Sequence, residues 1–151
     1  MVYNKTMKKI IYSAILLSTM LFTSFSAMAD EDCCEIKKFN PTKKDYTGAE
    51  LDCYNFSGMN LAGYVFVGAR LDKADFSNAN LEGANFKDAE IENAKFDNAN
   101  LKNATFENAD LEETSLRNAN IENTCFKNTE LEYTIWTDGK VCDAESVGSC
   151  W

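Results

Sequence analysis

A large apolar residue recurs at every fifth position along most of the chain. The series begins at Leu51 and runs without a gap to Trp136. Two positions before most of these residues the side chain is small, and between positions 69 and 119 it is alanine everywhere except at Thr114. We call the large residue the centre of each five-residue repeat. So regular a series predicts one repeating structure rather than a mixture of helices and strands.

A period of five fits neither a regular helix nor a flat strand. On an α-helix, five residues advance the chain by about 140°, which scatters the centres around the helix. On a strand, five residues carry the side chain to the opposite face. The pattern therefore predicts a chain that turns a corner once per repeat, with the centre and the small residue before it both pointing inward.

The alternation of aliphatic and aromatic centres predicts how many repeats make one coil. Three repeats per coil would stack leucine on phenylalanine, whereas four would stack like on like, which packs well between neighbouring strands. Alternation alone would also permit two. With four, the columns of centres are Leu51, Leu71, Ile91, Leu111 and Leu131; Phe56, Phe76, Phe96, Leu116 and Trp136; Leu61, Leu81, Leu101, Ile121 and Val141; and Phe66, Phe86, Phe106 and Phe126.

These repeats resemble the pentapeptide-repeat family, whose motif is written A-(D/N)-L-x-x. The stretch NANLEGANFKDAEIENAKFDNANLKNATF shows the likeness most plainly, and it extends over about residues 49–137. The resemblance implies an all-β fold, a right-handed quadrilateral β-helix of about four and a half coils. We expect the β-helix over residues 49–141, an N-terminal cap segment over 30–48 and a C-terminal cap over 142–151.

The first 29 residues have the features of a secretory signal peptide. Lys5, Lys8 and Lys9 precede an apolar run over residues 10–25, and Ala27-Met28-Ala29 follows it. This order of a basic, an apolar and a small-residue segment predicts cleavage after Ala29. The run is shorter than the roughly 20 residues that a spanning helix needs, so we expect no stable membrane anchor after cleavage. The mature chain is then exported, to the periplasm or outside the cell.

All six cysteines lie in the predicted mature chain, which favours disulfides in an exported protein. They are Cys33, Cys34, Cys53, Cys125, Cys142 and Cys150. The last two enclose a short loop and are expected to pair. Cys53 is expected to pair with one of the two adjacent cysteines near the mature N-terminus, which leaves Cys125 to the other one or free. No C-x₂-C pair supports a zinc site.

Composition excludes several classes of function. The 15 basic and 24 acidic residues give a net charge of −9, which becomes −12 once the three lysines of the signal segment are removed. Nucleic acid is therefore an unsuitable ligand, because neutralising phosphates requires a basic face. The chain has no histidine, which excludes imidazole catalysis and His-ligated metals. A filled solenoid presents convex walls rather than a catalytic pocket. We expect no enzyme activity and no cofactor.

Acidic residues gather on one side of the predicted coil. Of the ten positions that flank the first column of centres, nine are acidic and the tenth is Arg70. The nine are Glu50, Asp52, Asp72, Glu90, Glu92, Asp110, Glu112, Glu130 and Glu132. The 28 equivalent positions on the other three sides include only five acids. Because this sorting was independent of the apolar pattern, it supports four repeats per coil.

The acidic side has two interpretations. It is either a solvated face that keeps the protein soluble, or a docking strip for a basic protein surface or for weakly bound divalent cations. We expect a non-catalytic exported scaffold or protein-binding module that uses this face. The family suggests an alternative, because some cytoplasmic pentapeptide-repeat proteins mimic DNA and bind DNA gyrase. The signal peptide disfavours that alternative.

Overall fold

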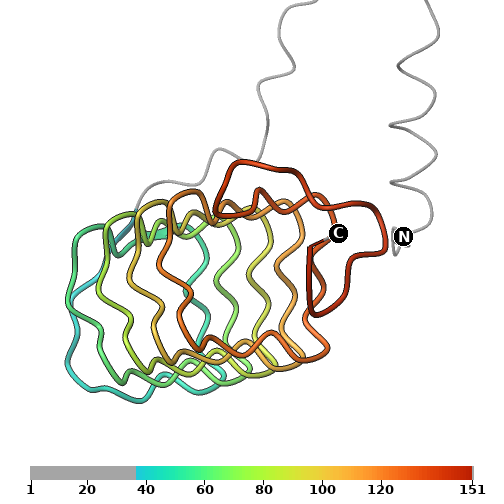
Figure 1. Cartoon of the computed structure of the whole chain (residues 1–151). Helices are drawn as coiled ribbons and strands as arrows, with labels where there is room; N and C mark the ends of the chain where they lie inside the picture. Colours follow the sequence, from blue (N-terminus) through green and yellow to red (C-terminus); the bar gives the residue numbers. More distant parts are fainter. Residues whose placement is uncertain (1–36, 151) are drawn as a thin grey trace, which may run out of the picture. The chain divides into compact units, whose positions relative to one another are not determined.

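A computed structural model describes residues 37–150 of the 151-residue chain. The predicted signal peptide, Cys33 and Cys34 lie outside the described residues. Two short strands, β1 (Lys37–Lys38) and β2 (Tyr54–Asn55), pair in parallel, with Lys37 opposite Tyr54. From residue 45 to residue 135 the chain winds as a right-handed β-helix (Figure 1), and single parallel bridges join its coils.

Each of these parallel bridges joins residues twenty positions apart, which confirms four repeats per coil. The bridges form four ladders, one along each wall of the β-helix, and we name the walls in chain order. The acidic wall carries Glu50, Arg70, Glu90, Asp110 and Glu130; the second wall carries Asn55, Asp75, Lys95, Ser115 and Ile135; the amide wall carries Asn60, Asn80, Asn100 and Asn120; the fourth wall carries Asp45, Val65, Asn85, Thr105 and Cys125.

The centres fill the interior in the predicted columns. Every centre from Phe56 to Leu116 is fully buried, and the alanines two positions before the centres are buried with them. Aromatic rings stack along each column and meet edge to face between columns. Phe76 stacks on Phe96 with 4.8 Å between ring centroids and meets Phe86 edge to face at 5.7 Å. Such contacts add to the free energy gained by burying the rings.

Each corner is a four-residue turn with one residue in the left-handed region. At a typical corner the N–H of Ala104 donates to the carbonyl of Leu101 at 2.9 Å, and Asn103 between them has φ of 59°. A positive φ at the third position is the mark of a type II turn. Glycine, asparagine and aspartate tolerate this conformation best, and they occupy most of the corners. The spacing of these residues is therefore a second sequence signal for the fold.

The corners that use another residue type lie one above another. They hold Cys53, Lys73, Glu113 and Tyr133, which share the column of corners that follows the acidic wall. A side chain of these types in the left-handed region costs roughly 1 kcal/mol relative to glycine. Local backbone strain is thus concentrated along one edge of the acidic wall.

Glu113→Gly is expected to stabilise the fold by roughly 0.5–1 kcal/mol, because glycine relieves the positive φ of 57° at this corner. The same change at Glu82, which lies outside the positive-φ corners, should destabilise the fold, because glycine gains only unfolded-state entropy there. Thermal unfolding of the two variants measures the difference. Equal destabilisation by both would contradict the strain at Glu113.

The N-terminal end is closed by aromatic side chains. The ladder begins at Asp45, four residues before the predicted start at residue 49, and Tyr46 is buried where a first centre would lie. Tyr54, Met59 and Tyr64, which are bulky where later coils have alanine, pack against the core at this end. Phe39, which follows β1, meets Tyr46 and Tyr54 edge to face, and its ring centroid lies 4.4 Å from that of Phe56. The cap thus extends the core rather than merely covering it.

At the C-terminal end the chain reverses instead of completing another coil. Val141 was predicted to continue the column of Leu61, and this prediction is wrong. The chain turns at Asp138-Gly139, so that Val141 pairs antiparallel with Ile135 and is 52% exposed. Asp-Gly is a strong turn signal, and glycine at φ of 86° allows the reversal. Within residues 37–150 the returning chain bridges the second wall, through Val141, and the acidic wall, where Val147 pairs antiparallel with Glu130.

The predicted disulfide between Cys142 and Cys150 is confirmed, with the two Cα atoms 4.9 Å apart. It ties the two halves of the returning segment together. Cys53 is also disulfide-bonded, but both of its predicted partners lie outside the described residues, so that pairing stays a prediction. Cys125 is free and exposed.

Candidate functional site: the acidic wall

The structure places all nine predicted acidic residues along one wall. Glu50, Glu90, Asp110 and Glu130 belong to its ladder of parallel bridges. The other five lie two positions further along the chain, at the far side of each centre, and are stacked by hydrogen bonds of the type that joins the Lys73 N–H to the Glu92 carbonyl at 2.8 Å. The five are Asp52, Asp72, Glu92, Glu112 and Glu132. The sequence grouping is therefore a spatial one.

Arg70 organises the N-terminal part of this wall. Its guanidinium lies 3.1 Å from a carboxylate oxygen of Asp52, 3.5 Å from one of Glu90 and 3.9 Å from one of Asp72. One cation thus serves three carboxylates from three successive coils. Exposed ion pairs of this kind contribute little stability each, but they lower the negative potential at this end of the wall.

Asp72 is the wall residue whose titration responds most clearly to its surroundings. Partial burial raises the pKa of its carboxyl above the usual value, and the charge of Asp52 raises it further. A hydrogen bond from the Glu92 backbone N–H and the nearby Arg70 oppose that rise without cancelling it. At Asp72, the charge of the carboxylate stacked beside it in the preceding coil thus acts together with burial.

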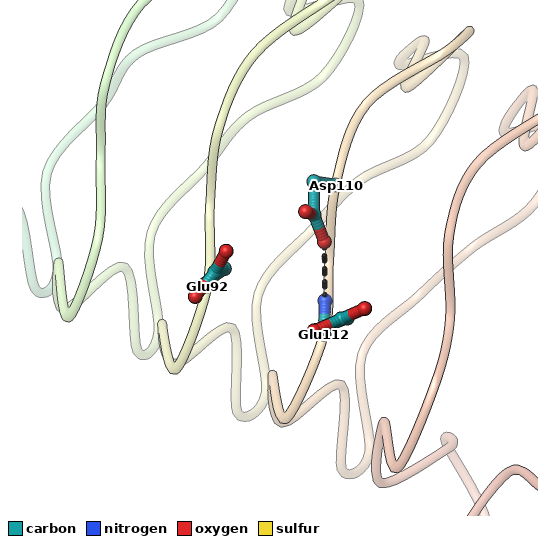
Figure 2. Close-up of side chains that lie close together, drawn as sticks. All are labelled: Glu92, Asp110 and Glu112. Atoms are coloured by element: carbon teal, nitrogen blue, oxygen red, sulfur yellow. Dashed lines mark hydrogen bonds between the residues drawn. The ribbon is translucent and has the colours of Figure 1, made fainter. Parts of the chain in front are cut away.

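The middle of the wall brings three carboxylates together. Glu92, Asp110 and Glu112 each offer an oxygen, and these oxygens lie within 4.8 Å of one another (Figure 2). The Glu112 backbone N–H donates to an Asp110 oxygen at 3.0 Å, which holds Asp110 in place. Calcium prefers roughly six to eight oxygen ligands, so three from a flat wall would support only weak binding.

The other walls differ because their columns carry complementary groups. On the fourth wall, Glu107 accepts from Lys87 at 3.4 Å and from Lys127 at 2.9 Å. On the amide wall, each asparagine donates to the one in the preceding coil, as Asn80 does to Asn60 at 3.2 Å. Stacking elsewhere is thus satisfied by alternating charge or by amide ladders. Only the acidic wall stacks carboxylates over most of its length.

Because these environments differ, we expect two single substitutions to change the thermal stability in opposite directions at neutral pH, and both effects to diminish in acid. The raised pKa of Asp72 means that the native state binds a proton there more tightly than the unfolded chain, so this residue favours folding more as the pH falls through its titration range. Asp72→Asn should raise the Tm by about 1–3 °C at pH 7 and have less effect in acid.

The hydrogen bonds from Lys127 and Lys87 lower the pKa of Glu107 in the folded protein. The ionised carboxylate therefore stabilises the fold above the ordinary glutamate pKa of 4.5, and this stabilisation is lost as the pH falls through the lower pKa of the folded state. Glu107→Gln should therefore lower the Tm at pH 7 and lose this effect near the acid end of the titration. Melting curves from acid to neutral pH test both variants. Parallel pH profiles for the two would contradict the assignment.

Sequence reasoning identified the acidic residues but missed two features of the wall. It treated Arg70 as an exception, whereas the structure shows that this residue pairs across three coils. It also overlooked the column of corners beside the wall, where Glu113 adds a further carboxylate. The corner column could have been found by comparing the residue types at every fifth position, because four of its five members, at positions spaced by multiples of twenty, are neither glycine nor asparagine.

Comparison with protein families identifies the repeat. The family model for the pentapeptide repeat region matches residues 42–116, which cover the first three and a half coils. The chain belongs to the pentapeptide-repeat family. A comparison with curated proteins finds no match. The resemblance inferred from the five-residue period is therefore confirmed.

Solved structures of other pentapeptide-repeat proteins share this fold. HetL from Nostoc sp. strain PCC 7120, which is involved in the regulation of heterocyst differentiation, is 25% identical with a TM-score of 0.63. The match covers 64% of this chain and 46% of HetL, so this chain spans about half the length of that relative. A pentapeptide-repeat protein from Cyanothece 51142 is 33% identical with a TM-score of 0.60, and the match covers 61% of this chain and 63% of the other.

A third relative comes from the thylakoid lumen of Arabidopsis thaliana. It is 27% identical with a TM-score of 0.61, and the match covers 70% of this chain and 79% of the relative. Together these structures support the right-handed β-helix. In the part of this pentapeptide-repeat protein that the structure describes, no helix is long and apolar enough to cross a membrane.

Proposed function

We propose that this pentapeptide-repeat protein is a non-catalytic, exported binding module that docks a basic protein surface on its acidic wall. The observation that carries the proposal is the single-wall placement of nine carboxylates, beside three walls whose columns are charge-balanced or neutral. Export rests on the signal-peptide pattern of the first 29 residues.

The form of the wall suits a flat, extended contact. Parallel coils set the carboxylates about 4.8 Å apart along the ladder, which makes a regular row of acceptors for lysine and arginine side chains. The rigid core beneath holds this row in place, so binding a partner loses little conformational entropy in the wall. A one-sided field of this kind also speeds encounter with a positively charged partner.

The proposal is tested by neutralising the wall without changing its shape. The variant carries Glu90→Gln, Glu92→Gln, Asp110→Asn and Glu112→Gln, and its matched control carries four neutralising changes on the other walls, at Asp75, Glu82, Asp97 and Glu122. Each protein is immobilised and offered the exported fraction of the cells that make it. A basic protein that binds the parent and the control but not the wall variant supports the proposal.

Salt and calcium provide the internal checks of this experiment. Binding through the wall should weaken steeply between about 50 and 200 mM salt, because the pairs are exposed and screened. Millimolar Ca²⁺ should compete if the Glu92, Asp110 and Glu112 cluster takes part. Recovery of the same partners by the parent and the wall variant would overturn the proposal, as would the absence of any basic partner.

A further inference from the structure

The four tyrosines among residues 37–150 lie in two contrasting environments. Tyr46, Tyr54 and Tyr64 lie at the N-terminal end, where their rings pack against the core and against neighbouring aromatic rings. Tyr133 lies in the last coil, at the corner that follows the acidic wall, and is 49% exposed. It contacts no other aromatic ring of the described chain. Packing in the core therefore does not account for this residue.

The backbone at this corner also disfavours a tyrosine. The φ of Tyr133 is 56°, in the left-handed region that suits glycine and asparagine best. The three other corners of the same coil hold asparagines, namely Asn118, Asn123 and Asn128. A bulky residue costs roughly 1 kcal/mol more than glycine there, and a half-exposed ring regains little of this by burial. Stability therefore gives no reason for a tyrosine at this position, and strain of this kind is common at residues that serve a function.

Carboxylates adjoin Tyr133, and the same stretch of wall carries one apolar side chain. Glu132 precedes the tyrosine on the acidic wall, and Glu113 occupies the same corner one coil earlier, about 4.8 Å away along the axis. The Glu113 backbone N–H donates to the Glu132 carbonyl at 2.9 Å, which holds the two coils in register. At the other edge of the wall, Val147 pairs with Glu130 and is 51% exposed. The last coil thus presents an aromatic face and an aliphatic side chain among its carboxylates.

The three N-terminal tyrosines show what such a ring binds in this protein. Each lies beneath a lysine ammonium whose nitrogen is 5.2–5.8 Å from the ring centroid, and the pairs are Lys37 with Tyr54, Lys43 with Tyr46 and Lys44 with Tyr64. A cation within about 6 Å of a tyrosine face is attracted by the charge distribution of the ring. Within residues 37–150, no lysine or arginine lies over Tyr133. Its face is therefore open to a cation from another molecule, and the adjoining carboxylates favour one.

We propose that Tyr133 is the anchor of the acidic wall and binds an arginine side chain of the docked partner. This proposal rests on the docking function proposed above for that wall. The planar guanidinium lies on the face of the ring, and its N–H donors reach the neighbouring carboxylates of Glu113 and Glu132. Arginine suits this corner better than lysine, because a guanidinium can stack on a ring and donate to carboxylates at the same time. An ammonium is a compact point charge and makes no such planar contact.

The anchor also gives the partner a direction along the wall. Arg70 lies near the N-terminal end of the wall, where it pairs with three carboxylates and repels further cations. The wall is more negative between Arg70 and Tyr133, so the basic side chains of the partner lie over this part. The partner is therefore a basic protein segment whose arginine lies over the last coil and whose other basic side chains extend towards the middle of the wall. Tyrosine and arginine are among the residue types that contribute most to binding at protein interfaces.

The test measures how two capped peptides, hexa-arginine and hexa-lysine, bind to the parent chain, to Tyr133→Phe and to Tyr133→Leu. Phenylalanine keeps the aromatic face, whereas leucine keeps a bulky side chain at the same corner without that face. Calorimetry at about 50 mM salt should show that the parent and the phenylalanine variant bind hexa-arginine about twofold to fivefold more tightly than the leucine variant. The parent should also prefer hexa-arginine to hexa-lysine, and the leucine variant should lose most of this preference.

Two further measurements locate the effect at the corner. The ring-proton NMR signals of Tyr133, assigned by their absence from the leucine variant, should shift when the parent is titrated with hexa-arginine. Lys73→Asn changes the same column of corners three coils earlier and should not weaken binding. Circular dichroism checks that all the variants are folded.

Equal affinity of hexa-arginine for the parent and the leucine variant would overturn the anchor. Ring signals of Tyr133 that do not move, or a parent that binds neither peptide at about 1 mM, would overturn it as well. The wall variant described above separates this failure from that of the docking function, and both it and Tyr133→Leu are expected to weaken binding. If only the wall variant weakens binding, the wall binds without the anchor. If only Tyr133→Leu weakens binding, the corner binds arginine and the docking function of the wall is contradicted.

Discussion

Phe96→Ala is expected to destabilise the β-helix by about 3–5 kcal/mol, which is a large part of the stability of a domain of this size. Phe96 is fully buried, stacks on Phe76 at 4.8 Å and meets Phe86 and Phe106 edge to face at 5.8 and 5.7 Å. Alanine would leave a cavity in the middle of the coil that the rigid ladders on all four sides cannot close.

Urea unfolding measures this effect, and Phe96→Leu is its control. The column already accepts leucine at position 116, which is fully buried, so the leucine variant should lose much less stability than the alanine variant. A loss below about 1.5 kcal/mol for the alanine variant would show that the coils relax around the gap. That result would contradict a core in which each coil fixes its neighbours.

Cys142→Ser combined with Cys150→Ser is expected to cost about 2–4 kcal/mol, because the disulfide closes the segment that caps the second and acidic walls. Cys142 is itself almost fully buried, so the loss combines a freed tail with a polar group in an apolar place. Without the bridge, the half-coil beneath the tail should open first.

Hydrogen exchange locates this opening and thermal unfolding measures its cost. Protection should fall at Leu131 and Trp136, whose N–H groups donate to Ser146 and Lys140 in the tail, before it falls at Leu111. Cys125→Ser is the control, since that thiol is free and exposed and should change stability by less than about 0.5 kcal/mol. Uniform loss of protection along the whole coil would contradict local capping.

The sequence predicted the interior of this fold well because one local rule governs it. A centre every fifth residue, a small residue two before it and a residue that tolerates positive φ at most corners leave few alternatives to a square coil. The number of repeats per coil followed from two independent patterns, the alternation of Leu with Phe and the grouping of acids. Each pattern tests the same stacking, and the bridges between residues such as Glu90 and Asp110 confirm it.

The ends were harder to predict because they depend on tertiary contacts rather than on the repeat. The Asp138-Gly139 turn was visible, but whether Val141 would continue the coil or fold back was decided by pairing with Ile135. The bridging role of Arg70 likewise needs coordinates, since three of its neighbours come from different coils. In the candidate site, the sequence thus predicted which residues belong to the acidic wall, and the structure shows which of their side chains pair.

The twenty-residue interval between bridged residues, as between Asn80 and Asn100, also restricts how such a chain can change in length. Loss or duplication of a single repeat would turn everything downstream by a quarter and move carboxylates from their own wall onto its neighbour. Gain or loss of a whole coil would leave every column intact and only lengthen or shorten the row of charges. Variation in this protein is therefore expected in steps of one full coil, each of which changes the reach of the acidic wall and not its direction.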